Sequence, residues 1–491
     1  MRSRPAGGCP PITIVAAFVL IASAGCQLAP RLQRPALPTA AAWPQEYGGD
    51  PQSGEPASAL GWRDFFADPR LDALIGAALQ HNRDLEVAVA QVEEARGLYR
   101  IQRADRLPTL DVSAEAARTR VSPRSARVGG AAGGDFGAVR PGAETATFER
   151  YSLAVGMTAF ELDFWGRVRQ LSEAARAQYL ASAQAARAFR LSLIREVALA
   201  YLDTLEARER TELAEATVRS RREGLRIAKR RLDAGVTSAL EFRQAETLLT
   251  QAETELAALH LARAQSENLL AVLVGGPLEE PLPDPLPLAQ QIDLQQLAPG
   301  LPSEVLTARP DILAAEERLR AARASVGAAR AAFFPSIALI GSYGYASTEL
   351  DELVGKDAQT WSFGPSITLP VFDFGRRRSN LTVAQARENI AIASYERAIQ
   401  AGFQEVSNAL AGRRYLAEQV AAQERALAAQ RDLAELARTR YREGVVRYIE
   451  VLDAERNLFA AEQSLLQVRR AEAANLVALY VALGGGQVER R

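Results

Sequence analysis

The sequence contains few of the residues from which metal sites and catalytic centres are usually built. Its 491 residues include two histidines, His81 and His260, and two cysteines, Cys9 and Cys26. The two histidines stand far apart in the sequence, which disfavours a histidine-based metal site or catalytic triad. The sequence also has no glycine-rich loop of the kind that cradles phosphates. We therefore expect a protein that is not an enzyme and that binds no metal ion and no diffusible cofactor.

The sequence also lacks a charge excess and a long apolar run. Its 58 lysines and arginines nearly balance its 59 aspartates and glutamates, for a net charge of −1. This balance gives no indication of a nucleic-acid partner. Beyond the N-terminal segment, no stretch reaches the roughly 18–20 apolar residues of a membrane-spanning helix. If the chain crosses a membrane, we expect it to do so with strands.

The N-terminus carries an export signal. Arg2 and Arg4 precede a short apolar run at 12–21, and small residues at 23–25 precede Cys26. This order is typical of a signal peptide, here assigned to residues 1–25. Cleavage before Cys26 would leave a thiol able to carry a diacylglyceryl lipid, which would be the only group attached to the chain. Gln27 in the next position resembles the signal that directs bacterial lipoproteins to the outer membrane. The alternative is ordinary cleavage nearby, with a free Cys26.

The rest of the chain consists of two copies of one pattern. The segment "GVTSALEFRQAE" at 235–246 matches "GVVRYIEVLDAE" at 444–455, and these segments are 209 residues apart. An earlier pair of segments, starting at Asp84 and Asp311, is 227 residues apart. The difference, 227 − 209, means that the first copy carries 18 extra residues between Pro108 and Gly166, an interval that includes a glycine-rich loop at 127–142. Internal repetition of this kind predicts two structural units of the same design.

The repeat predicts the order of elements along the chain. We divide it into an anchoring linker (26–60), a first repeat (61–275), a proline-rich linker (276–308), a second repeat (309–485) and a tail (486–491). Each repeat has a short helix, two strands, a long helix and a return helix. The short helices are expected at 84–107 and 311–334, the long ones at 167–233 and 376–442, and the return ones at 239–274 and 448–483. The strands are expected at about 109–119, 148–162, 336–346 and 360–372.

The predicted strands have one apolar face and one polar face. In the last strand, Trp361, Phe363 and Ile367 alternate with Ser362 and Thr368. This alternation over about ten residues is typical of outer-membrane strands, with lipid on one side and water on the other. The alternative is a pair of hairpins that cover a soluble core. Four strands are too few to close a barrel, so we expect several chains to share one.

Several stretches resemble the TolC-type outer-membrane factors, and in particular the OprM-like (NodT-type) efflux lipoproteins. The stretches are "GWRDFFADPRLDALIGAALQHNRDL" (61–85), "RIQRADRLP" (100–108), "ARPDILAAE" (308–316), "GAARAAFFPSI" (327–337), "QEVSNALA" (404–411) and "ALGGG" (482–486). The resemblance spans nearly the whole chain. It implies an α+β membrane protein that forms a homotrimer. Each chain would give four strands to a shared 12-stranded barrel, continued by a long periplasmic α-helical barrel.

The resemblance also implies a function. Proteins of this kind are passive exit ducts in the outer membrane, working with a periplasmic adaptor and an inner-membrane pump of the RND type to export drugs and other small molecules. A duct for type I protein secretion has the same fold and remains an alternative. A non-conducting envelope tether is a further alternative, although a tether needs no strands with a polar face.

By the same resemblance, the helical barrel closes at its periplasmic end, just after the second hairpin turn. The matching positions are Asp453, Glu450 and Ile449 at the aperture, with Tyr441, Glu241 and Arg447 as ties between helices. Glu450 departs from the OprM pattern, in which this residue is uncharged. Three symmetric copies of each acid would attract cations in a narrow throat. The alternative is that both acids only stabilise the start of a helix, by roughly 0.3–1 kcal/mol each.

Overall fold

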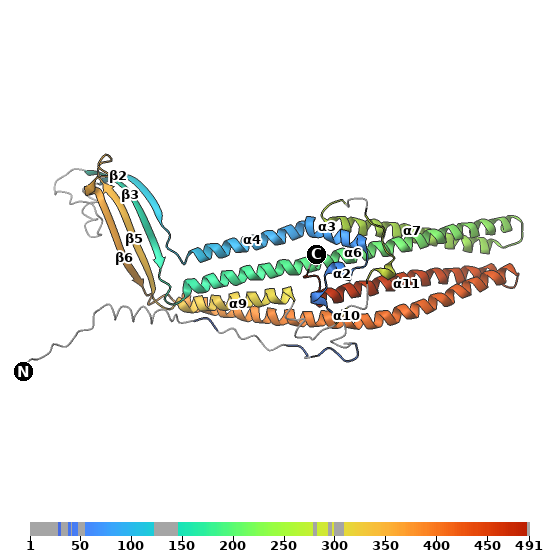
Figure 1. The fold of residues 1–491 in the computed structure, drawn as a ribbon. Helices are drawn as coiled ribbons and strands as arrows, with labels where there is room; N and C mark the ends of the chain where they lie inside the picture. The colour runs from blue at the N-terminus through green and yellow to red at the C-terminus, as the bar shows by residue number, and fades with distance from the viewer. Residues whose placement is uncertain are drawn as a thin grey trace, which may run out of the picture. The chain divides into compact units, whose positions relative to one another are not determined.

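The computed structural model describes residues 28–30, 38–40, 42–47, 55–121, 146–277, 282–292, 297–298 and 309–488 (Figure 1). Cys26 and the predicted signal peptide lie outside these residues. The chain divides into two compact units. The first contains Met1–Gln33, Ala95–Tyr179 and Leu319–Ala391, and the second contains Arg34–Glu94, Leu180–Arg318 and Ile392–Arg491. Each unit includes parts of both sequence repeats.

The first unit contains an antiparallel sheet in the order β2-β3-β5-β6. Its strands are β2 (Asp111–Val121), β3 (Ala146–Glu161), β5 (Ser336–Ser347) and β6 (Gln359–Thr368). All four lie where the alternation predicted them. The last strand ends at Thr368 and not at 372, because Pro370 follows and has no N–H to donate to a ladder. Within the described chain, the outer edges of β2 and β6 have no partner strand.

The apolar face of β6 is uncovered. Trp361 is 73% exposed, and Phe363 and Ile367 are exposed to a similar degree. Large apolar side chains on one sheet face normally pack against a second layer. Their exposure here is consistent with the predicted lipid-facing side of the strand.

Six long helices follow the predicted repeat. They are α4 (Arg83–Ala104), α6 (Arg167–Asp233), α7 (Ala239–Val274), α9 (Pro310–Ala331), α10 (Arg376–Arg442) and α11 (Tyr448–Ala482). Helices α4 and α9 end about one turn earlier than predicted, before Pro108 and Pro335, because the residues preceding a proline are disfavoured in helical conformation. Among the described residues, no helix is both long and apolar enough to cross a membrane.

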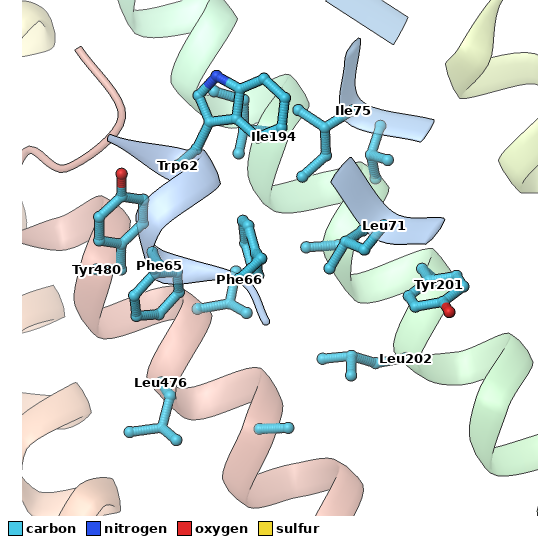
Figure 2. Packing of buried hydrophobic residues seen from close by; sticks show 14 of the residues in the cluster. Trp62, Phe65, Phe66, Leu71, Ile75, Ile194, Tyr201, Leu202, Leu476 and Tyr480 are labelled. Atoms are coloured by element: carbon cyan, nitrogen blue, oxygen red, sulfur yellow. The ribbon is translucent and has the colours of Figure 1, made fainter. Parts of the chain in front are cut away.

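The second unit is held by an aromatic core that the sequence pattern did not reveal. Two short helices, α2 (Trp62–Phe65) and α3 (Pro69–His81), bring their apolar side chains against α6 and α11 (Figure 2). The ring of Phe65 stacks on that of Tyr480, with centroids 4.1 Å apart. The Tyr480 hydroxyl donates to the carbonyl of Leu60 at 2.8 Å. This core joins helices that belong to different repeats.

A fully buried carboxylate lies beside this core. Asp68 caps α3 by accepting from the N–H of Arg70 at 2.8 Å. It also accepts from the Tyr201 hydroxyl of α6 at 2.7 Å, from the N–H of Leu286 at 3.0 Å and from the Gln291 side-chain amide at 2.8 Å. Burial, followed by the bond to Asp68, raises the pKa of Tyr201, so its hydroxyl remains a donor. The carboxylate thus connects a helix start, a long helix and the linker between the repeats.

We expect Asp68→Ala to destabilise the protein by about 3 kcal/mol, because two buried and two partly buried donors lose their acceptor. Asp68→Asn keeps one acceptor oxygen and should cost clearly less. Thermal unfolding of the detergent-solubilised protein measures both effects, with Asp64→Ala on the exposed side of α2 as a control. Equal midpoints for wild type and Asp68→Ala would contradict this account.

Candidate functional site at the hairpin tips

Both helical hairpins turn with the same backbone geometry. Gly235 follows α6 with φ of 71°, and Gly444 follows α10 with φ of 77°. In each turn the next valine N–H reaches back to a carbonyl five residues earlier, Val236 to Arg231 and Val445 to Arg440, both at 2.9 Å. Only glycine adopts this left-handed conformation without strain. The two glycines therefore fix where the return helices begin.

The predicted aperture residues lie in the first turns of α11. Glu450 and Asp453 are both exposed, and Ile449 is half-buried. Val451 and Leu452 between them are buried against the rest of the unit. Glu450 lies 3.9 Å from Arg440, and Asp453 lies 3.2 Å from Arg456.

These two ion pairs neutralise the charge of each acid only in part, so both carboxylates can still act on ions in the surrounding water. All four side chains are about half exposed, and such exposed pairs contribute little because water and salt screen them. Both carboxylates lie on the exposed face of the helix.

Tyr441 connects the two hairpins within one chain. Its hydroxyl is hydrogen-bonded to the guanidinium of Arg231 on α6, and that guanidinium lies 5.5 Å from the centre of the tyrosine ring. The Tyr441 ring also lies against Tyr448, with centroids 5.1 Å apart.

Tyr448 fits into a notch on α6. A Cβ at Gly224 would lie 2.6 Å from the Tyr448 hydroxyl oxygen, so a side chain there would displace the ring. Burial, with smaller contributions from Glu455 and Tyr441, raises the pKa of Tyr448 to about 12. The phenol therefore stays uncharged in this contact at neutral pH.

Glu241 and Arg447 are not brought together within the chain. Glu241 accepts from the Thr237 hydroxyl, and its own N–H is capped by Ser238 at 3.4 Å. Arg447 occupies the corresponding cap position of α11 but gives no side-chain cap. A tie between Glu241 and Arg447 would have to join two copies of the chain, and it stays a prediction.

Sequence reasoning missed three residues of this site: Arg231, Tyr448 and Gly224. An isolated glycine inside a long helix is a signal of close packing, so Gly224 could have been noticed. The sequence position of Arg231 gave no such signal, because its contact with Tyr441 spans 210 residues.

The N-terminal segment has a defined neighbour where it is described. The carbonyl of Leu28 accepts from Arg330 of α9 at 3.0 Å, within the first unit. Cys26, two residues earlier, lies outside the described residues. Within the described part of the chain, no group of three or more His, Cys, Asp or Glu side chains could hold a metal ion.

The chain is similar to proteins of a known family along nearly its whole length. A family model described as outer membrane efflux protein matches residues 74–276 and 301–485. The solvent efflux pump outer membrane protein SrpC of Pseudomonas putida is 40% identical, over 96% of this chain and 97% of its own. The cation efflux system protein CusC of Escherichia coli K12 is 37% identical, over 97% of this chain and 100% of its own.

A solved structure has the same fold. The MtrE outer membrane channel of Neisseria gonorrhoeae, in its open state, aligns with a TM-score of 0.82 and 38% identity, over 94% of this chain and 99% of its own. These matches confirm the predicted family, its TolC-like fold and the outer-membrane location with extension into the periplasm. The chain belongs to the outer membrane efflux protein family, whose members are channel components of efflux pumps.

Proposed function

We propose that this chain is the exit duct of a tripartite efflux pump of the RND type, exporting drugs and other small molecules across the outer membrane. The observation that carries the proposal is the end-to-end similarity to relatives named for solvent, toluene and antibiotic efflux. The partners would be a periplasmic adaptor and an inner-membrane pump. The energy for transport would come from the pump.

Deletion of the gene should lower the concentration of hydrophobic drugs and organic solvents that stops growth, severalfold or more, and the wild-type gene should restore it. A pull-down with the tagged protein should recover the adaptor and pump encoded nearby. A deletion strain with unchanged drug tolerance that fails instead to secrete a protein would favour the type I secretion duct.

The sheet edges support a shared barrel. The order β2-β3-β5-β6 is antiparallel throughout, so β6 of one copy could pair with β2 of the next in the antiparallel sense. Open edges are not tolerated in lipid, and three copies would supply twelve strands. The helix α4 has no buried residue and exposes Val87 and Leu98, as expected for a surface that a neighbouring copy covers.

In such a trimer the hairpin tips would meet around one axis. Asp453, Glu450 and Ile449 would form the periplasmic aperture, and the link from Tyr441 to Arg231 would hold the two hairpins of each chain together. Glu241 and Arg447 are proposed as ties between chains. Because the partners of the two acids are exposed, their negative charge would act on ions in the throat.

Replacing Asp453 and Glu450 together by alanine should raise single-channel conductance in planar bilayers and lower cation selectivity. The reason is that the throat would lose six carboxylates in a trimer, together with their contacts to Arg456 and Arg440. The double variant Asp432→Ala/Glu435→Ala removes the same charge from exposed positions of α10 and should behave as wild type. Unchanged conductance and selectivity in the first variant would remove both acids from the aperture.

We also propose that Cys26 carries a lipid. The proposal rests on the sequence, in which a positively charged start, a short apolar run and small residues precede Cys26.

Radioactive palmitate should label the wild-type protein and not Cys26→Ser. Cys9→Ser serves as the control and should keep the label, because Cys9 would leave with the signal peptide. Absence of label from the wild type would refute lipidation without affecting the proposed channel.

A further inference from the structure

Four junctions between helices and strands lie at one end of the sheet. Strands β2 and β5 begin there, and strands β3 and β6 end there. The register pairs Ser336 with Thr368 and Glu161 with Ala338, which brings the junctions level with one another. We call the junctions and the adjoining helix turns the collar, defined as residues 100–110, 161–169, 331–335 and 369–378.

Apolar and aromatic side chains of the collar are exposed on the surface of the single chain. Leu107 and Leu110 are exposed, as are Phe372 and Phe374. Phe374 is 91% exposed, and it is the one non-glycine residue of the described chain with positive φ, at 52°. This backbone conformation is unfavourable for a phenylalanine. Among the described residues, the aromatic neighbour of the Phe374 ring is Phe372, with centroids 4.5 Å apart.

Two further collar aromatics are fixed in place. Trp165 stacks on Phe334 with centroids 4.7 Å apart, and its indole N–H donates to the carbonyl of Pro335 at 2.8 Å. Tryptophan and other aromatic residues are enriched where a protein passes from lipid to water. The collar therefore has the side chains of a membrane interface.

The collar also carries a local excess of arginine. Six exposed arginines have no ion pair and no side-chain hydrogen bond to any other described residue. They are Arg100, Arg103, Arg106, Arg169, Arg376 and Arg378. The whole chain has a net charge of −1, so this excess belongs to the collar and not to the composition.

The acidic side chains of the collar are bound to other groups of the chain. Glu161 is paired with Arg167, and Asp373 is paired with Arg377 at 3.0 Å. Asp163 caps the start of α6 by accepting from the N–H of Arg169 at 2.7 Å. The fourth acid, Asp105, accepts from the Gln102 side-chain amide at 2.6 Å. Eight arginines against four acids give the collar a net positive charge, and none of the six arginines forms an ion pair with a collar acid, although Asp373 acts on Arg376 at longer range.

We propose that the collar binds the phosphate groups of anionic phospholipids in the outer-membrane leaflet that faces the periplasm. A guanidinium matches phosphate oxygens with two parallel donors, and the neighbouring phenylalanine and leucine side chains enter the acyl boundary. The cationic and apolar residues lie close together on the same short segments at the strand ends, which favours a lipid surface over a second copy of this chain. The proposal requires the outer-membrane location and does not depend on what the channel transports.

Spin-labelled lipids test the proposal with the full-length protein in phosphatidylcholine vesicles. Electron spin resonance compares the association of spin-labelled phosphatidylglycerol with that of spin-labelled phosphatidylcholine. The wild type should prefer phosphatidylglycerol, and high salt should weaken the preference. The variant Arg169→Gln/Arg376→Gln/Arg378→Gln should lose about fivefold in preference for each arginine that contacts a headgroup.

A matched control separates the collar from total charge. The variant Lys229→Gln/Arg230→Gln/Arg425→Gln removes the same charge from the parts of α6 and α10 in the second unit, and it should keep the preference. The charge-conserving variant Arg169→Lys/Arg376→Lys/Arg378→Lys should keep most of it.

Two results would overturn the proposal. One is an unchanged preference in the glutamine variant of the collar. If the assembly of that variant also dissociates in native mass spectrometry, the arginines are assigned to contacts with a second copy. The other is a wild type with no preference, a measurement that does not require any variant to fold.

Discussion

The arrangement of the second unit depends on burying one charge with a full set of donors. Asp68 joins the start of α3, the long helix α6 and the linker between the repeats through four hydrogen bonds. A buried carboxylate is costly unless its oxygens are satisfied, so these segments have to meet in one geometry. The neighbouring stack of Phe65 on Tyr480 adds α11 to the same place. Helices of the two repeats are therefore joined by packing around Asp68 and Phe65, in addition to the covalent linker.

The long helices and the strands could be predicted because their signals are local and repeated. Glycines at 235 and 444 stop the helices, and prolines at 108 and 335 mark the ends of the shorter ones. The contacts of the site could not be predicted in this way. The bond from Tyr441 to Arg231 and the fit of Tyr448 against Gly224 join distant residues, and they follow only from how the hairpins pack. The arginines of the collar are visible in the sequence, but only the strand register brings them to one end of the sheet.

The two repeats have the same order of helices and strands, but equivalent positions in them differ in capping and in burial. Ser238 caps α7, whereas Arg447 at the equivalent position leaves α11 without a side-chain cap. In the same way, α9 buries several side chains and α4 buries none. The short helix of the second copy is thus packed within the chain, whereas that of the first copy leaves its apolar side chains exposed, as the proposed trimer would require. Duplication followed by this kind of divergence lets one chain use the same helix in two ways.

Within the described residues, the outer edges of β2 and β6 have no partner strand, and this affects the protein before it reaches its membrane. A strand edge with free N–H and C=O groups pairs readily with any other strand. Newly exported chains carry two such edges beside an apolar sheet face, so chains in transit attract one another in the wrong register as well as in the right one. Aggregation in the periplasm therefore competes with insertion, and the yield of functional protein falls as the concentration of unassembled chains rises.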